Sequence, residues 1–113
     1  MKLDEDCLKA GRNGAHVLPR MLTHRSALFL QAHDAGKARA DAERALALLQ
    51  AQAEPETYST YIGRAYLALG RALAAQGKSE EARSAFRSAA DHLQNALGAD
   101  QPETRTARQL AGL

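Results

Sequence analysis

The chain has 113 residues, the size of one ordinary domain, which is long enough to bury a hydrophobic core. It contains 25 alanines and no tryptophan, a composition that favours closely packed helices over strands. Its formal net charge is +2 with acidic and basic residues interspersed, so no basic block marks a nucleic-acid or membrane-surface binder.

The N-terminal residues and the single cysteine disfavour a secreted or membrane protein. Cys7 can form neither an internal disulfide nor a cysteine-rich zinc site, and residues 1–6 are too acidic for a secretory signal. No apolar run approaches the roughly 20 residues of a membrane span. We therefore expect a cytoplasmic protein that begins with a cap or connector at residues 1–14.

Glycine and proline divide the remaining chain into segments that read as helices. These breaks are Gly11–Gly14, Gly36-Lys37, Glu54-Pro55, Gly77-Lys78 and Gly98–Pro102. A first pair of helices is expected at residues 15–35 and 38–52, with Pro19 in the first turn, where a missing N–H does least harm. A second pair is expected at residues 58–75 and from Ser79 to Gly98, where Ser79 acts as N-cap before the acidic residues 80–81.

Apolar residues recur in these segments at the spacings of three and four that are typical of an amphipathic helix. Residues 38–52 carry a stripe of Ala42, Ala45, Leu46 and Leu49. Residues 58–75 carry Tyr58, Tyr61, Ile62, Ala65, Tyr66, Leu69 and Leu73. The segment after Gly77 carries Ala82, Ala85, Phe86, Ala89, Ala90, Leu93 and Leu97.

The turn between the helices of each pair is duplicated in sequence. Aligning Gly36-Lys37 with Gly77-Lys78 places Ala27-Leu28 on Ala68-Leu69 and, with one extra residue, Ala42 on Ala82 and Leu46 on Phe86. Residues 54–57 and 101–104 also echo each other, so the chain ends as if opening a third unit. We expect one domain with a first repeat at 15–53, a second at 55–98 and a C-terminal capping helix at 102–113.

One stretch of the second repeat resembles the tetratricopeptide repeat family. It contains, at that family's spacing, Tyr66, Leu69-Gly70, Leu73, Gly77, Ala82, Phe86 and Ala89. Gly70 and Ala82 are small where two helices approach, Gly77 accommodates the turn, and Phe86 fills the space between successive hairpins. In the first repeat, Phe29 replaces the glycine and Arg25 the aromatic residue.

Residues 97–104 further resemble the linker of the longer repeats in kinesin light chains and bacterial regulatory proteins, with Gln101 in the place of a frequent histidine. The resemblance implies an all-α fold in which antiparallel helical hairpins stack as a short right-handed α-solenoid. It also implies a setting within a larger bacterial regulatory or signalling protein.

In such a solenoid the first helix of each hairpin lines a concave groove. By this resemblance, the partner-binding groove consists of Thr23, Ser26, Leu30, His33, Arg64, Leu67, Ala68, Arg71 and Ala75, together with Ala27, Asp34 and Ala74. Arg64 and Arg71 are seven residues apart on one helix face and suit carboxylates or phosphate on a partner. Members that clamp chaperone tails have Lys and Asn where this chain has Leu67 and Arg71, so that ligand is disfavoured.

No pattern of residues indicates catalysis or a cofactor. The four histidines, His16, His24, His33 and His92, lack the paired spacing of a metal site, and lone Cys7 lacks an evident base. Residues 11–14 lack the lysine of a phosphate-binding loop, and the paired carboxylates suit helix starts. We expect a non-enzyme without metal or cofactor.

The sequence therefore predicts a protein–protein or protein–peptide interaction module that binds neither nucleic acid nor membrane. The alternative is a ligand-sensing regulatory domain with a peptide or small effector in the groove. Two hairpins leave apolar end faces, through which two copies could form a homodimer.

Overall fold

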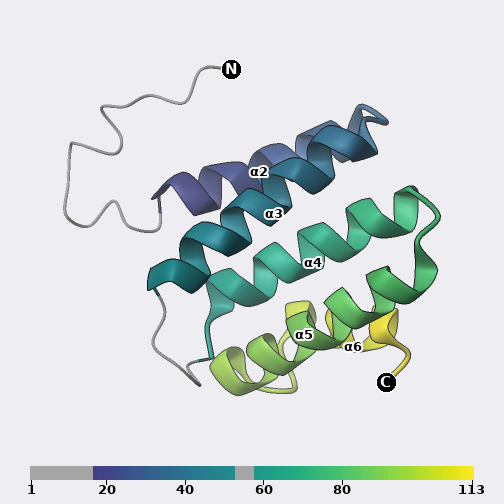
Figure 1. The fold of residues 1–113 in the computed structure, drawn as a ribbon. Coiled ribbons are helices and arrows are strands. Elements are labelled where there is room, and N and C mark those ends of the chain that lie inside the picture. The colour runs from purple at the N-terminus through teal and green to yellow at the C-terminus, as the bar shows by residue number, and fades with distance from the viewer. Residues whose placement is uncertain (1–16, 53–57) are drawn as a thin grey trace.

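The computed structural model describes residues 17–52 and 58–113, and all regular structure in these ranges is α-helical. The helices are α2 (Val17–Gln31), α3 (Ala35–Gln52), α4 (Thr60–Ala75), α5 (Ser79–Leu97) and α6 (Pro102–Ala111). Each helix packs against the next along the chain, and α2 also contacts α4 (Figure 1). The all-α prediction is confirmed for this part of the chain, whereas the predicted cap or connector at 1–14 lies outside it.

The hairpins α2–α3 and α4–α5 are closed by the same kind of turn. His33 (φ 62°) and Gly77 (φ 80°) adopt the left-handed conformation. Each donates its N–H to the carbonyl three positions earlier, and the next residue donates to the carbonyl five positions earlier, at distances of 2.8–3.0 Å. These bonds form the Schellman motif, which satisfies carbonyls that would otherwise be unpaired at a helix end.

These two turns reveal the register of the duplication. His33 precedes Gly77 by 44 residues, and Ala35 at the start of α3 precedes Ser79 at the start of α5 by the same interval. The predicted alignment of residues 36–37 with 77–78 is therefore wrong. A left-handed turn residue is usually glycine, but in the first hairpin it is His33, and the nearby Gly36 has another role.

Helix α3 begins at Ala35, so the predicted start at residue 38 is wrong. Gly36 lies in the first turn of this helix. The carboxylate of Asp34 accepts a hydrogen bond from the backbone N–H of Lys37 at 3.1 Å, which caps this helix end. The preceding helix was predicted to extend to residue 35, but α2 ends at Gln31.

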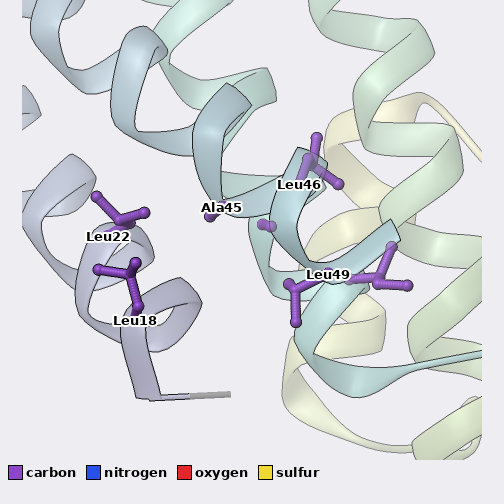
Figure 2. Close-up of a cluster of buried hydrophobic side chains, with 7 residues drawn as sticks. Leu18, Leu22, Ala45, Leu46 and Leu49 are labelled. Atoms are coloured by element: carbon purple, nitrogen blue, oxygen red, sulfur yellow. The ribbon is translucent and has the colours of Figure 1, made fainter. Parts of the chain in front are cut away.

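The buried faces of α3 and α5 coincide in the 44-residue register. Helix α3 buries Ala38, Asp41, Ala42, Ala45, Leu46 and Leu49, and α5 buries Ala82, Ala85, Phe86, Ala89, Ala90 and Leu93. Both predicted stripes are thus confirmed, except that Leu97 is only partly buried. The apolar side chains of the first hairpin gather against α4, and Figure 2 shows Leu18 and Leu22 of α2 beside Ala45, Leu46 and Leu49 of α3.

The stripe predicted for residues 58–75 is only partly correct. Ile62, Ala65 and Leu73 are buried, but Tyr58 is 49% exposed. Tyr58 precedes the N-cap Ser59, whose hydroxyl accepts from the N–H of Ile62, and therefore lies outside the helical periodicity.

The close approach predicted at Gly70 is present between α4 and α5. A Cβ atom on Gly70 would lie 2.5 Å from Cε1 and 2.6 Å from Cδ1 of Phe86, far inside van der Waals contact. Phe86 packs in a cluster with Leu73, Ala82, Ala85 and Ala111 of α4, α5 and α6. Gly63 provides a second close approach, because its Cβ would lie 2.8 Å from Cγ of Leu93.

The first hairpin meets the same requirement with different residues. In the 44-residue register Ser26 corresponds to Gly70 and Leu22 to Tyr66, so the predicted substitutions Phe29 for glycine and Arg25 for the aromatic residue are wrong. The buried Ser26 hydroxyl donates a hydrogen bond of 2.7 Å to the carbonyl of Ala38 on α3. A small polar side chain therefore bridges the two helices where the second hairpin has glycine.

The ends of the later helices agree with most of the predicted breaks, but α4 begins at Thr60 and not at residue 58, and α6 ends at Ala111 and not at residue 113. Helix α5 ends at Leu97 with Gly98 (φ 102°) as its C-cap, and Glu80 and Glu81 lie in its first turn, but its N-cap is Lys78 and not Ser79. Lys78 joins the two helices, because its N–H donates to the carbonyl of Leu73 in α4 and its carbonyl accepts from the N–H of Ala82 in α5. Helix α6 starts with Pro102.

Candidate functional site

A groove lies between α2 and α4, with a volume of about 360 Å³. We call it the α2–α4 groove. It is lined by Thr23, Ser26, Ala27, Leu30 and Gln31 of α2 and by Arg64, Leu67, Ala68 and Arg71 of α4. Four of these residues are alanine or leucine, and the two arginines stand on the same helix. The groove therefore combines an apolar floor with positive charge on one wall.

Most residues predicted to line a binding groove meet here. Thr23, Ser26, Leu30, Arg64, Leu67, Ala68 and Arg71 all line the α2–α4 groove, as does Ala27. His33 and Ala75 do not, nor do Asp34 and Ala74. His33 lies in the left-handed turn beyond the end of α2, and Ala75 is the last residue of α4, so both stand past the walls.

A second hollow of about 320 Å³ continues the groove toward the N-terminus of α2. It shares Thr23, Ala27 and Arg64 with the first and adds Pro19, Arg20, His24, Leu49 and Tyr61. The Arg20 guanidinium lies 5.7 Å from the centre of the Tyr61 ring, within the range of a cation–π contact. The groove and this extension therefore form one elongated surface with Arg64 at the junction.

Arg64 is held by Glu103 of α6. Its Nε donates to Oε2 at 2.8 Å and its Nη2 donates to Oε1 at 2.9 Å, a bidentate pair. The hydrogen bond lowers the pKa of Glu103 and raises that of Arg64, although both side chains are substantially exposed. The pair links the wall of the groove to the last helix of the chain.

Arg71 differs from Arg64 in its surroundings. Within residues 17–52 and 58–113 it has no hydrogen bond or ion pair, and it is exposed. The two groove hydroxyls are engaged elsewhere, because Thr23 donates to the carbonyl of Pro19 at 2.9 Å and Ser26 donates to Ala38. Arg71 is thus the charged group on the groove wall most available to a ligand.

His92 of α5 lies away from the groove and supports the start of α4. Its Nδ1 accepts a hydrogen bond of 3.1 Å from the backbone N–H of Ser59, and its ring stacks on Tyr66 with centroids 5.9 Å apart. Burial lowers the pKa of His92, and the neighbouring Asp91 only partly opposes this shift. The neutral imidazole is therefore the form that the fold favours.

This contact predicts a pH dependence of stability. Because the pKa of His92 is lower in the folded chain than in the unfolded chain, its contribution is complete above the unfolded value of about 6.5. The contribution is lost as the pH falls below that value toward the folded pKa. We expect urea midpoints to drop between pH 7 and pH 5, and the drop to be smaller in His92→Gln; an equal drop in both proteins would contradict the assignment.

Other residues considered for chemistry are not gathered into a site. Among the described residues, no three His, Cys, Asp or Glu side chains lie close enough to hold a metal ion. Cys7, His16 and residues 11–14 lie outside the described ranges. None of the helices described here is both long and apolar enough to cross a bilayer.

The predicted groove omitted Gln31 and all five residues that the extension adds, and it gave no sign that Glu103 contacts Arg64. Arg20 aligns with Arg64 in the 44-residue register, so the correct alignment would have found it. Gln31 follows Leu30 at the end of α2. Glu103 belongs to α6, and its reach to Arg64 depends on how a third element packs, for which the sequence carries no direct signal.

No family model matches the chain, and no curated protein or solved structure matches it.

Proposed function

We propose that the chain is a tetratricopeptide-like module that binds a protein or peptide segment in the α2–α4 groove. The support for a repeat is the 44-residue recurrence of turn geometry and buried positions in the two hairpins. In this proposal the hairpins stack as a right-handed solenoid, and α2, α4 and α6 are successive first helices.

The observation that carries the proposal is the groove itself. Alanine and leucine side chains from two helices form its floor, and arginines form one wall and the junction with its extension. An apolar surface with a few placed polar groups is what peptide recognition requires. By contrast, we propose no catalytic role, no cofactor and no binding of nucleic acid or membrane.

The proposed setting is a larger cytoplasmic regulatory protein of bacteria, with the module as its docking part. This setting rests on the resemblance of residues 58–104 to repeat proteins of that kind. A homodimer through the end faces is a further proposal, and sedimentation equilibrium of the purified chain tests it directly.

A steric variant tests the groove. Peptides selected from a displayed random library against the wild-type protein should bind Ala68→Phe at least about tenfold more weakly, because the added ring fills the groove floor and excludes the ligand's side chains. The measurement is fluorescence polarisation with the selected peptides. Equal affinities would place their binding site elsewhere.

Ala74→Phe is the matched control for this variant. Ala74 is an exposed residue of the same helix and does not line the groove. The control should bind the peptides as the wild type does, and circular dichroism should show that both variants keep their helices.

A small effector is a second candidate occupant of the same groove. The volume of about 360 Å³ lies within the range of small-molecule sites, roughly 300–1,000 Å³. A ligand-sensing domain would show a rise in melting temperature with a compound in the absence of any protein partner. A compound that stabilises the wild type but not Ala68→Phe would support this function over peptide docking.

A further inference from the structure

The charged side chains along the groove and its extension are of one sign. Arg20, Arg64 and Arg71 line it, and no described Asp or Glu is among its wall residues. An acidic side chain reaches this surface from α6, where Glu103 pairs with Arg64. The surface is thus electrostatically complementary to an acidic ligand.

The arginines of the groove wall differ in what they can offer such a ligand. Arg64 already binds a carboxylate through Nε and Nη2, the guanidinium edge that suits bidentate recognition. Arg71, seven residues later on the same helix, has no ion pair among the described residues. A ligand carboxylate can therefore pair with Arg71 directly, but it must displace Glu103 to pair fully with Arg64.

We propose that the groove takes an acidic peptide segment, and that Glu103 is a built-in competitor for the carboxylate site on Arg64. This inference rests on the proposed function and specifies its ligand. The peptide places apolar side chains against Leu30 and Leu67 and a carboxylate on Arg71. A second carboxylate competes with Glu103, so the affinity of the groove depends on the contact between α4 and α6.

The floor of the groove favours a peptide over a polyanion such as a nucleic acid. Leu30, Leu67, Ala27 and Ala68 offer apolar contact but no hydrogen bond from their side chains. Nucleic-acid binding relies on many phosphate contacts, and the cations here are three arginines spread over two helices. An acidic peptide with interspersed leucines uses both the floor and the wall.

The competitor can be removed without removing the helix that carries it. Helix α6 is held on α5 by the buried residues Thr104, Ala107 and Ala111, whereas the Glu103 side chain is 40% exposed. Glu103→Gln deletes the charge and keeps the shape, so it should leave α6 in place. Loss of an exposed ion pair of this kind corresponds to a change of about two- to fivefold in an equilibrium constant.

The probe is a fluorescein-labelled twelve-residue peptide of repeated Leu-Glu-Glu, compared with its Leu-Gln-Gln counterpart by fluorescence polarisation at low salt. Glu103→Gln should bind the acidic probe about two- to fivefold more tightly than the wild type, and Arg71→Ala should bind it more weakly. The uncharged probe should bind more weakly than the acidic one and respond little to Glu103→Gln.

Two control variants separate a local effect from a change in net charge. Glu43→Gln removes the same charge from an exposed pair with Arg39 on α3, and Arg83→Ala removes an exposed arginine of α5. An equal gain in Glu103→Gln and Glu43→Gln would overturn the competitor role. Equal losses of affinity for the acidic probe in Arg71→Ala and Arg83→Ala would overturn the role of Arg71.

Failure of this inference and failure of the proposed function give different results. Suppose that library-selected peptides bind more weakly to Ala68→Phe but equally well to Glu103→Gln. That result would contradict the inference and leave the groove as a peptide site. If no peptide, selected or acidic, is sensitive to Ala68→Phe, the proposed function itself is wrong.

Discussion

Phe86→Ala should lower the free energy of unfolding by about 3–5 kcal/mol, the largest effect that we expect from a single substitution in this chain. The ring is 5% exposed and lies against the Gly70 backbone, with α6 packed against the same cluster. Its loss leaves a cavity at the contact of three helices, which neighbouring alanines are too small to fill. Chemical denaturation followed by circular dichroism measures the change.

The only other phenylalanine in the chain serves as the control. Phe29 is half-buried, and the Arg25 and Lys37 side chains each lie 5.6 Å from the centre of its ring. Since cation–π contacts at exposed sites contribute little, Phe29→Ala should cost about 1 kcal/mol or less. Comparable losses from both substitutions would show that Phe86 is not the centre of the core.

The core of the fold was predictable because it follows from helical spacing alone. Ala42, Ala45, Leu46 and Leu49 recur at intervals of three and four, and all four are buried. The same rule was correct for α5 and less so for α4. There, Tyr61 and Tyr66 are too large and polar to be fully enclosed, so they lie at the edge of the core, and Tyr58 precedes the helix.

The register of the repeat was not predictable from glycine positions. A glycine is the expected residue where φ is positive, yet the first turn has His33 in that place and Gly36 within a helix. The bonds of the Schellman turn and the cap by Asp34 define the turn regardless of which side chain occupies it. The interval of 44 residues is therefore defined by the turn bonds and the helix starts, and not by the glycines.

The groove was largely predictable, but its electrostatics were not. The resemblance to tetratricopeptide repeats predicted Arg64, Leu67, Ala68 and Arg71 as groove residues, and the spacing of seven placed the two arginines on one helix face. Whether an arginine on that wall is free or paired depends on a side chain from another helix. Glu103 lies 39 residues from Arg64, and only the packing of α6 brings the two together.

Gly70→Ala should destabilise the protein by about 1–2 kcal/mol, although alanine is by itself the better helix former. The new methyl group would lie 2.5 Å from Cε1 of Phe86, and the ring is packed too tightly among α4, α5 and α6 to move aside freely. This overpacking exceeds the gain of about 1 kcal/mol in helix propensity. The urea midpoint should therefore fall.

Gly36→Ala is the control that measures the gain in helix propensity without a clash. It makes the same change in α3, where the nearest atom to the new Cβ is Oδ1 of Asp34, 3.8 Å away. It should be neutral or stabilising by up to about 1 kcal/mol. If the clash with the ring is the cause at Gly70, then Gly70→Ala should lose most of its effect in a Phe86→Leu background, where the ring is absent. Additive changes in the double variant would mean that Gly70 is required for a reason other than the approach of Phe86.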